Sequence, residues 1–197
     1  MEGMATSSTI AIYRLHVSLN DIERLIWRRI ELSANTTLKQ LHELLQIAMG
    51  WQNCHMHQFE VGEQRYGVVD PNDPWDADTR PEAKYALADV LPEKGAWLTY
   101  WYDFGDDWFH EIELESVHAA EPDALYPRLT GGVRRCPPED CGGPFGYENL
   151  LAALTNRKHR EHRDLLDWVG PGFDPEAFSI AETDKRLRRK KSLAAKL

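Results

Sequence analysis

Residues 10–50 read IAIYRLHVSLNDIERLIWRRIELSANTTLKQLHELLQIAMG and contain two alternating segments followed by one helical segment. Residues 26–32 alternate in the same way as residues 10–19, in which one face carries Ala11, Tyr13, Leu15, Val17 and Leu19. A period of two is typical of a strand with one buried face. Because Asn20 and Asp21 supply a turn signal, we predict that the two strands pair antiparallel.

The helical segment has a clear beginning and end. Thr37 is predicted to be the N-cap of the helix, because Gln40 follows three residues later in a capping-box pattern. Gly50 suits the C-terminal end of a helix. The apolar residues between them recur at helical spacing: Leu38, Leu41, Leu44, Leu45, Ala48 and Met49. Since they form one stripe, the helix is predicted to pack on one face of the sheet.

Four further strands are predicted downstream. Residues 57–61 and 64–68 resemble a short hairpin, and residues 97–104 and 108–117 a second one that turns at Gly105. The predicted class is therefore α+β, with a mainly antiparallel sheet in the order β-β-α-β-β-β-β, one packed helix and a helical C-terminal third.

Loops and helices make up the remainder. Residues 70–82 are predicted to be a loop, and residues 127–146 hold four prolines and five glycines, which predicts an irregular segment. Helices are expected near residues 147–155, 160–169 and 175–191.

We expect one α+β domain over residues 10–187. It has a sheet part (10–120), a Pro/Gly loop (121–146) and a helical part (147–187). Residues 1–9 are expected to be disordered, and residues 188–197 form a basic tail.

Composition restricts the class of protein. The chain has 197 residues, 42% of them hydrophobic and 28% charged, which suits a domain with a well-buried core. No run approaches the roughly 18–20 apolar residues of a membrane helix. The N-terminus is small and polar, with Glu2 in place of the positive charge of a signal peptide. Three cysteines fit a reducing compartment, so a cytoplasmic location without membrane contact is expected.

The charge is unevenly distributed. Seven of the 23 basic residues and none of the 32 acidic residues lie in 185–197, which leaves residues 1–184 with a formal net charge of −16. Such an acidic body repels nucleic-acid phosphates, whereas the basic tail could contact them. The alternative is that the tail only ends a C-terminal helix, where the helix dipole favours cations.

Two pairs of residues suggest a metal site. His55 and His57 would point the same way on a strand, and Cys136 and Cys141 form a C-x4-C pair. We predict that the Pro/Gly loop folds back over the sheet and brings Cys136 and Cys141 near His55, His57 or the aspartate hairpin. Two imidazoles and two thiolates could then hold zinc. In the alternative interpretation the cysteines are small buried residues and His57 is a core histidine.

Acidic residues gather at the second hairpin. Asp103, Asp106, Asp107 and His110 lie within eight residues and could hold Mg²⁺ or act as an acid/base pair, or the aspartates could simply cap the turn. Arg28 and Arg29, which lie beside aromatic residues, are candidates for contacts with nucleic acid. The sequence has no nucleophile elbow, Walker loop, dinucleotide fingerprint or zinc-protease helix.

Several motifs resemble those of the Ri-plasmid ORF-three-like family. They are IWRRI (26–30), TLKQLH (37–42), AMGW (48–51), HMHQF (55–59), YDFGDDWFH (102–110) and CPPEDCGGP (136–144). The resemblance implies a single α+β domain of the prokaryotic cytoplasm, often encoded near mobile elements, and some relatives are labelled transposon passenger or resolvase-like. The family's characteristic positions correspond here to Trp27, Arg28, Arg29, His42, His55, His57, Asp103, Asp106, Asp107, His110, Cys136, Asp140 and Cys141.

Three functions remain open from the sequence. The first is a non-enzymatic binding or accessory domain of plasmid or mobile-element biology, with a protein or nucleic-acid partner. The second is a metal-dependent hydrolase or nuclease that uses zinc or magnesium at the His-x-His, aspartate and Cys-x4-Cys groups. The third is weak nucleic-acid binding through Arg28, Arg29 and the basic tail. Only the second requires a metal ion.

Overall fold

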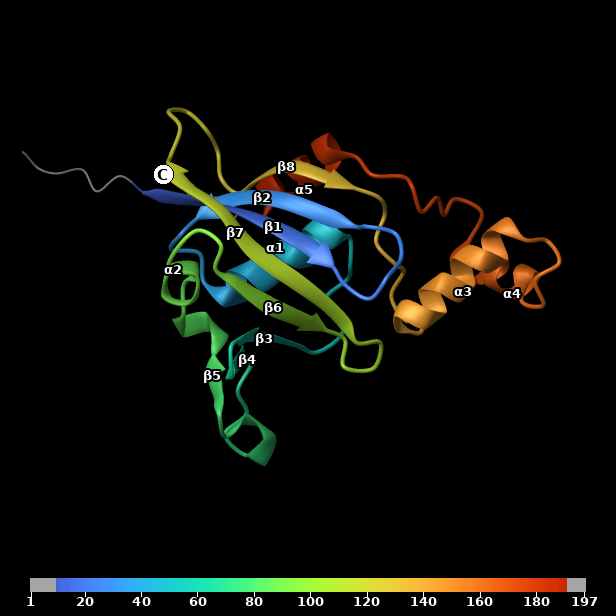
Figure 1. Cartoon of the computed structure of the whole chain (residues 1–197), viewed down its shortest axis with the longest axis horizontal. Coiled ribbons are helices and arrows are strands. Elements are labelled where there is room, and N and C mark those ends of the chain that lie inside the picture. The colour runs from blue at the N-terminus through green and yellow to red at the C-terminus, as the bar shows by residue number, and fades with distance from the viewer. Residues whose placement is uncertain (1–9, 191–197) are drawn as a thin grey trace, which may run out of the picture.

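The computed structural model describes residues 10–190, which form one eight-stranded sheet and five α-helices (Figure 1). The strand order is β5-β4-β3-β6-β7-β1-β2-β8, and every neighbouring pair is antiparallel except β4–β5. The strands are β1 Ala11–Leu19, β2 Trp27–Ser33, β3 His57–Val61, β4 Gln64–Gly67, β5 Thr79–Pro81, β6 Trp97–Tyr102, β7 Trp108–Ala119 and β8 Arg128–Val133. The helices are α1 Leu38–Met49, α2 Leu87–Val90, α3 Gly143–Thr155, α4 His162–Val169 and α5 Ile180–Arg189. The predicted α+β class with a mainly antiparallel sheet is confirmed.

The expected disordered segment 1–9 and residues 191–197 of the basic tail lie outside the described residues. Within residues 10–190, no helix combines the length and the apolar character that a membrane crossing would require.

The central strands bury one face and expose the other. Alternate residues of β6 and β7 are fully buried: Leu98, Tyr100, Tyr102, Trp108, His110, Ile112 and Leu114. The residues between them, such as Glu111 and Glu113, face solvent. The buried face packs on α1, which lies behind the sheet in Figure 1. This arrangement follows from the period-two pattern, because successive side chains on a strand point to opposite faces.

Helix α1 begins and ends where its sequence signals predict. The side chain of Thr37 accepts a hydrogen bond from the backbone of Gln40, whose side chain in turn accepts one from the backbone N–H of Thr37. Gly50 adopts a left-handed conformation, with φ at 90°, and ends the helix. The helix buries Leu38, Leu41 and Leu45 completely.

The prediction of an irregular loop over residues 127–146 is wrong for β8, which pairs with β2 at the edge of the sheet. The glycine content predicts loop residues at Gly131 and Gly132, but both pair with residues of β2 that have large side chains, Arg29 and Arg28. A Cβ atom at Gly131 would come within 2.9 Å of the Trp27 ring. The glycines therefore permit close packing rather than interrupting the strand.

Smaller differences concern the boundaries of elements. The short strand β5 lies inside the predicted loop 70–82 and pairs parallel with β4. Helix α3 begins at Gly143, and α5 is shorter than expected. Helices α3 and α4 lie beyond one end of the sheet, whereas α5 packs on β8 and α1 (Figure 1).

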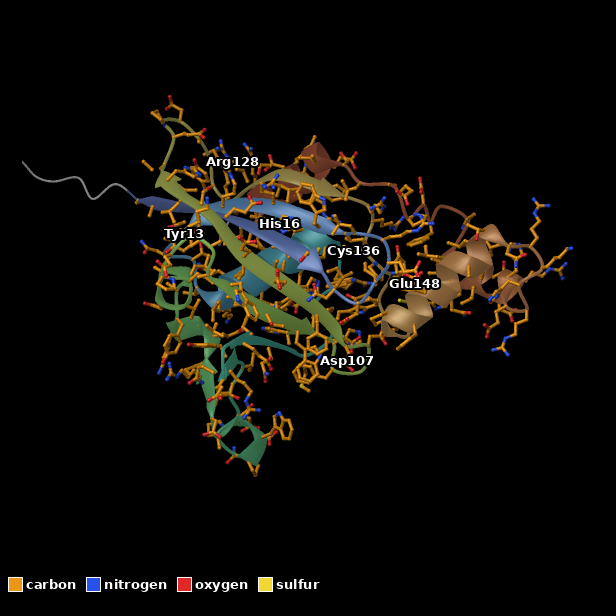
Figure 2. The ribbon with its side chains drawn as sticks, in the orientation of Figure 1. Tyr13, His16, Asp107, Arg128, Cys136 and Glu148 are labelled. Atoms are coloured by element: carbon orange, nitrogen blue, oxygen red, sulfur yellow. The ribbon has the colours of Figure 1, made fainter. Side chains whose placement is uncertain are left out.

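Three segments that are distant in the sequence meet at the turn of the β6–β7 hairpin. The backbone N–H of Asp103 donates to the carbonyl of Met56 at 2.9 Å, just before β3. The N–H of Gly142, after β8, donates to the Asp106 carboxylate at 3.1 Å. Figure 2 shows Asp107 at this turn and Cys136 in the segment after β8. The candidate site lies where these segments meet.

Candidate functional site

A histidine surrounded by carboxylates occupies this meeting point. The Nε2 atom of His55 lies 3.2 Å from Asp140 Oδ1, 3.6 Å from Asp103 Oδ2 and 3.9 Å from Glu139 Oε2. The Cys54 thiol also lies close: ligand atoms of Cys54, His55 and Glu139 are all within 4.8 Å of one another, as are those of His55, Asp103 and Asp140. We call these five residues the His55 cluster.

Asp103 is held in place by the hairpin turn. It directly follows β6 and adopts a left-handed conformation with φ at 60°, which aspartate tolerates better than most residues. Its Oδ1 atom accepts hydrogen bonds from the backbone N–H groups of Gly105 and Asp106. The second oxygen, Oδ2, is therefore free to face His55.

Glu139 is held by hydrogen bonds from Gln52 and Tyr102. Its Oε1 atom accepts hydrogen bonds from the Gln52 backbone N–H at 2.7 Å and from the Tyr102 hydroxyl at 3.1 Å. Its Oε2 atom is buried and has no hydrogen-bond partner among the described residues, and the same is true of His55 Nε2. Buried polar atoms are almost always satisfied, so two such atoms 3.9 Å apart mark a place where one ligand could contact both.

The cluster is closed on one side and open on the other. The side chains of Asp103 and Glu139 are each only 8% exposed, whereas that of Asp140 is 73% exposed. Negative charge concentrates here. Burial, reinforced by the Glu139 carboxylate, raises the pKa of the Tyr102 phenol. The same two causes raise the pKa of the Cys54 thiol. The site therefore favours a cation.

The spacing of the donor atoms fits a single metal ion. Two ligand atoms about 2.1 Å from a tetrahedral ion lie about 3.4 Å apart. The three distances from His55 Nε2, between 3.2 and 3.9 Å, bracket that value. Imidazole, carboxylate and thiolate are all ligands of zinc.

The four residues predicted to bind zinc do not come together. His57 Nε2 lies 2.8 Å from Glu82 Oε2, and its ring stacks on His42 at 3.4 Å. Cys136 is buried, with its sulfur 3.3 Å from an Arg28 nitrogen and 3.4 Å from the Met49 sulfur.

Of these four residues, only His55 belongs to a group of three or more potential metal ligands within residues 10–190. The physical reason is that β3 begins at His57, so His55 precedes the strand and the rule of alternate faces does not relate the two histidines. Cys141 is partly buried, and burial, followed by the charge of Asp106, raises the pKa of its thiol to about 12.

The predicted aspartate group is divided in the same way. Asp106 accepts the backbone N–H of Gly142, and Asp107 accepts the Trp101 indole N–H at 3.0 Å. His110 is fully buried, and that burial lowers its pKa to about 4. Of these four residues, only Asp103 reaches His55. Asp103 is also the residue that caps the turn, through its Oδ1 atom, so the interpretation in which Asp106 and Asp107 cap the turn is wrong.

Arg28 and Arg29 are both engaged within the fold. Arg28 is 1% exposed and donates to the carbonyls of Trp27, Ala48, Val133 and Arg134 and to the Cys136 sulfur. Arg29 forms a bidentate ion pair with Glu115 at 2.6 and 2.7 Å. Neither guanidinium group is therefore free for a phosphate backbone.

Sequence reasoning assigned no role at the site to Glu139 or to the Cys54 thiol. Both lie next to motifs that the sequence suggests as metal ligands: Cys54 precedes His55, and Glu139 lies between Cys136 and Cys141. A carboxylate pair next to a Pro-Pro step was the available signal, since a stiff loop can present Glu139 and Asp140 in a fixed direction.

Comparison with known proteins gives relatives of nearly the same length. The model of the plasmid pRiA4b ORF-3-like protein family matches residues 11–182. An uncharacterized protein, y4hQ of Sinorhizobium fredii (strain NBRC 101917 / NGR234), is 34% identical over 179 residues, covering 90% of this chain and 91% of that protein. The crystal structure of MM3350, a protein of unknown function from Methanosarcina mazei Go1, is similar with a TM-score of 0.80 at 34% identity, covering 89% of this chain and 98% of that one. The resemblance that the motifs suggested is thereby confirmed, and the chain belongs to the plasmid pRiA4b ORF-3-like family.

Proposed function

We propose that this protein binds one divalent cation at the His55 cluster and that zinc is the preferred ion. The observation that carries the proposal is the pair of buried, unsatisfied atoms, His55 Nε2 and Glu139 Oε2, with two further carboxylates beside them. Three carboxylates lie close together around His55, so their negative charges repel one another. A divalent ion removes that repulsion and satisfies both atoms.

The ion would act as a cross-link. Its ligands come from the segment before β3, from the β6–β7 turn and from the segment that leads into α3. Metal binding that joins distant segments contributes directly to the stability of the fold. This supports a non-enzymatic accessory domain, and the family description, which names a plasmid reading frame, supports a role in plasmid or mobile-element biology.

A metal-dependent hydrolase or nuclease is the second candidate. The observation in its favour is the 73% exposure of Asp140, through which solvent can reach the ion. Catalytic zinc sites combine three protein ligands with a water molecule, whereas structural sites are closed. Hydrolytic activity that depends on added metal and disappears in Asp103→Asn would favour this candidate over the accessory one.

Metal titration of protein purified without a histidine tag tests the proposal. Calorimetry with zinc is expected to give a stoichiometry of one. Asp103→Asn keeps the Oδ1 acceptor of the turn but removes the negative charge next to His55, so it should weaken zinc binding by about tenfold or more.

Asp107→Asn is the matched control, because Asp107 lies on the same turn but contacts Trp101 rather than His55. It should leave the affinity unchanged. An absence of zinc binding, or equal losses in both variants, would contradict the proposal.

A further inference from the structure

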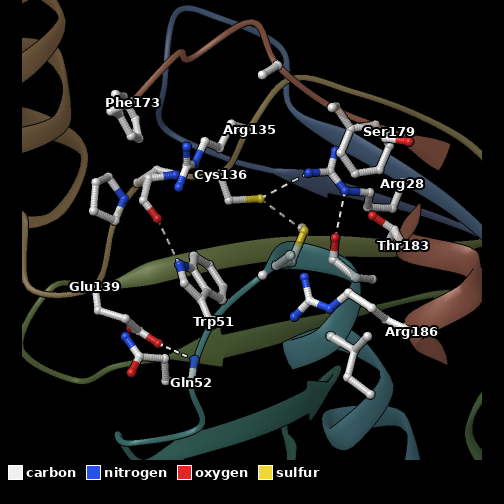
Figure 3. Close-up of a pocket in the computed structure, with 18 of the residues that line it drawn as sticks. Arg28, Trp51, Gln52, Arg135, Cys136, Glu139, Phe173, Ser179, Thr183 and Arg186 are labelled. Atoms are coloured by element: carbon white, nitrogen blue, oxygen red, sulfur yellow. Dashed lines mark hydrogen bonds between the residues drawn. The ribbon is translucent and has the colours of Figure 1, made fainter. Parts of the chain in front are cut away.

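A large cavity borders the His55 cluster and has Glu139 in its wall. It has a volume of about 760 Å³. Its walls come from the C-terminal end of α1, the segment after β8, the end of α4, the segment that joins α4 to α5, and α5 itself (Figure 3). The volume is in the range of cavities that bind small organic molecules, about 300–1,000 Å³.

The cavity has three guanidinium groups in its walls. Arg28, Arg135 and Arg186 approach it from different elements, as Figure 3 shows. In the part of the chain that the structure describes, none of the three forms an ion pair with a carboxylate, unlike Arg24, Arg29 and Arg128. Arg135 and Arg186 are exposed to solvent, so their donors are available.

Arg28 adds a buried charge behind this surface. All of its N–H groups donate to neutral acceptors, four carbonyl oxygens and the Cys136 sulfur. The C-terminal end of α1, whose Ala48 carbonyl accepts one of these bonds, offsets part of the charge. A full negative charge in the cavity would offset the remainder more effectively, because the low dielectric of the interior strengthens the attraction.

The remaining wall is largely apolar and aromatic. Trp168 lines the cavity and is 49% exposed, so about half of its surface is accessible to a ligand. Phe173 and Phe178 lie beneath guanidinium groups, Arg135 at 4.9 Å and Arg28 at 3.7 Å from the ring centres. Such walls stack against flat rings, and the arginines can pair with an oxyanion.

We propose that this cavity binds an organic anion with a planar, apolar body, whose acidic group is held by Arg135 and Arg186 and whose ring lies against Trp168. Glu139 and Glu182 also line the cavity, and they restrict the anionic group to the side formed by the arginines. The cavity shares Glu139 with the proposed metal centre, but the arginines that would hold the anion lie outside the His55 cluster, so anion binding does not require the metal.

Two fluorescent dyes that differ in one charge test this proposal. Anilinonaphthalene sulfonate carries a sulfonate on a planar aromatic body, and N-phenylnaphthylamine has a similar body without the charge. Both are titrated into the full chain with a chelator present, so the outcome does not depend on metal. The sulfonate dye should bind at one site, and Arg135→Gln combined with Arg186→Gln should weaken it by about tenfold, with little effect on the neutral dye.

Arg189→Gln provides the matched control, because Arg189 is an exposed arginine of the same helix as Arg186 but does not line the cavity. It should leave both affinities unchanged, and Trp168→Ala should weaken both dyes. Because the substituted side chains are exposed, the variants should unfold at the same temperature as the parent protein. Failure of the sulfonate dye to bind, or equal losses in Arg189→Gln and the double variant, would overturn the proposal.

Discussion

At the scale of single residues, Arg28 joins three parts of the chain. Its guanidinium group donates to Ala48 at the end of α1, to Val133 at the end of β8 and to Arg134 just after β8. It also lies 3.7 Å from the centre of the Phe178 ring. The position follows from the alternation in β2, because Arg28 lies on the same face as the buried Ile30.

Replacing Arg28 should therefore destabilise the protein. Arg28→Met keeps an apolar stem but leaves several carbonyls without a donor, each at a cost of about 1–3 kcal/mol. We expect the free energy of unfolding to fall by about 3 kcal/mol or more. The neighbouring Arg29→Gln breaks only a partly exposed ion pair and should cost about 1 kcal/mol or less. Urea denaturation measures both, and similar values for the two variants would contradict this assignment.

Two buried histidines predict how stability depends on pH. Burial lowers the pKa of His110 to about 4, and burial together with the neighbouring His57 lowers the pKa of His42 to about 4. In the unfolded chain these groups titrate near 6.5, so between pH 6.5 and 4 the unfolded state binds more protons than the folded state. Stability should then be complete above that window and fall as the pH decreases through it.

The expected slope is about 1.4 kcal/mol per pH unit for each histidine. His110→Phe removes one of the two groups and should reduce the slope, as measured by urea denaturation across the window. The same slope in the parent protein and in His110→Phe would show that His110 becomes protonated in the folded state as readily as in the unfolded one.

At the scale of elements, local signals account for what the sequence predicted well. Helix α1 is specified by its own capping box and by Gly50, and β7 by its alternation of apolar residues with glutamates. Strand β8 could not be predicted, because its glycines are explained only by the Trp27 and Phe178 side chains that pack against them. The proline content of the segment after β8 predicts that it folds back over the sheet, but its exact path depends on contacts with the β6–β7 turn, such as that of Gly142 with Asp106.

The close approach of the segment after β8 to the β6–β7 turn depends on Gly143. A Cβ atom at this position would overlap the carbonyl oxygen of Asp106, and φ is +68°, a value that L-residues rarely adopt. Gly143→Ala should cost more than about 1 kcal/mol of unfolding free energy and should weaken zinc binding, because Glu139 and Asp140 would be displaced.

Gly172→Ala is the matched control. No atom lies within 4 Å of a Cβ built there, and its φ is not positive. The control should be close to neutral in both thermal unfolding and zinc titration. If Gly143→Ala behaved like Gly172→Ala, the close approach of the loop to the hairpin would not be needed for the site.

At the scale of the whole molecule, the candidate site is a product of tertiary structure. His55 and Asp103 could be selected from the sequence by residue type and by the motifs around them. Their partners could not, because Glu139 and Asp140 lie more than thirty residues further along the chain and reach His55 only through the path of the segment after β8. Arg135 and Arg186 meet at one cavity for the same reason: α5 folds back against β8 and α1.

The most direct test of the metal site is anomalous diffraction at the zinc edge from crystals of the zinc-loaded protein. We predict one anomalous peak at the His55 cluster, about 2.0–2.2 Å from His55 Nε2 and from the Asp103 carboxylate. A cluster without a peak, or a peak only beside His57 and Glu82 or beside the cysteines Cys136 and Cys141, would contradict the account.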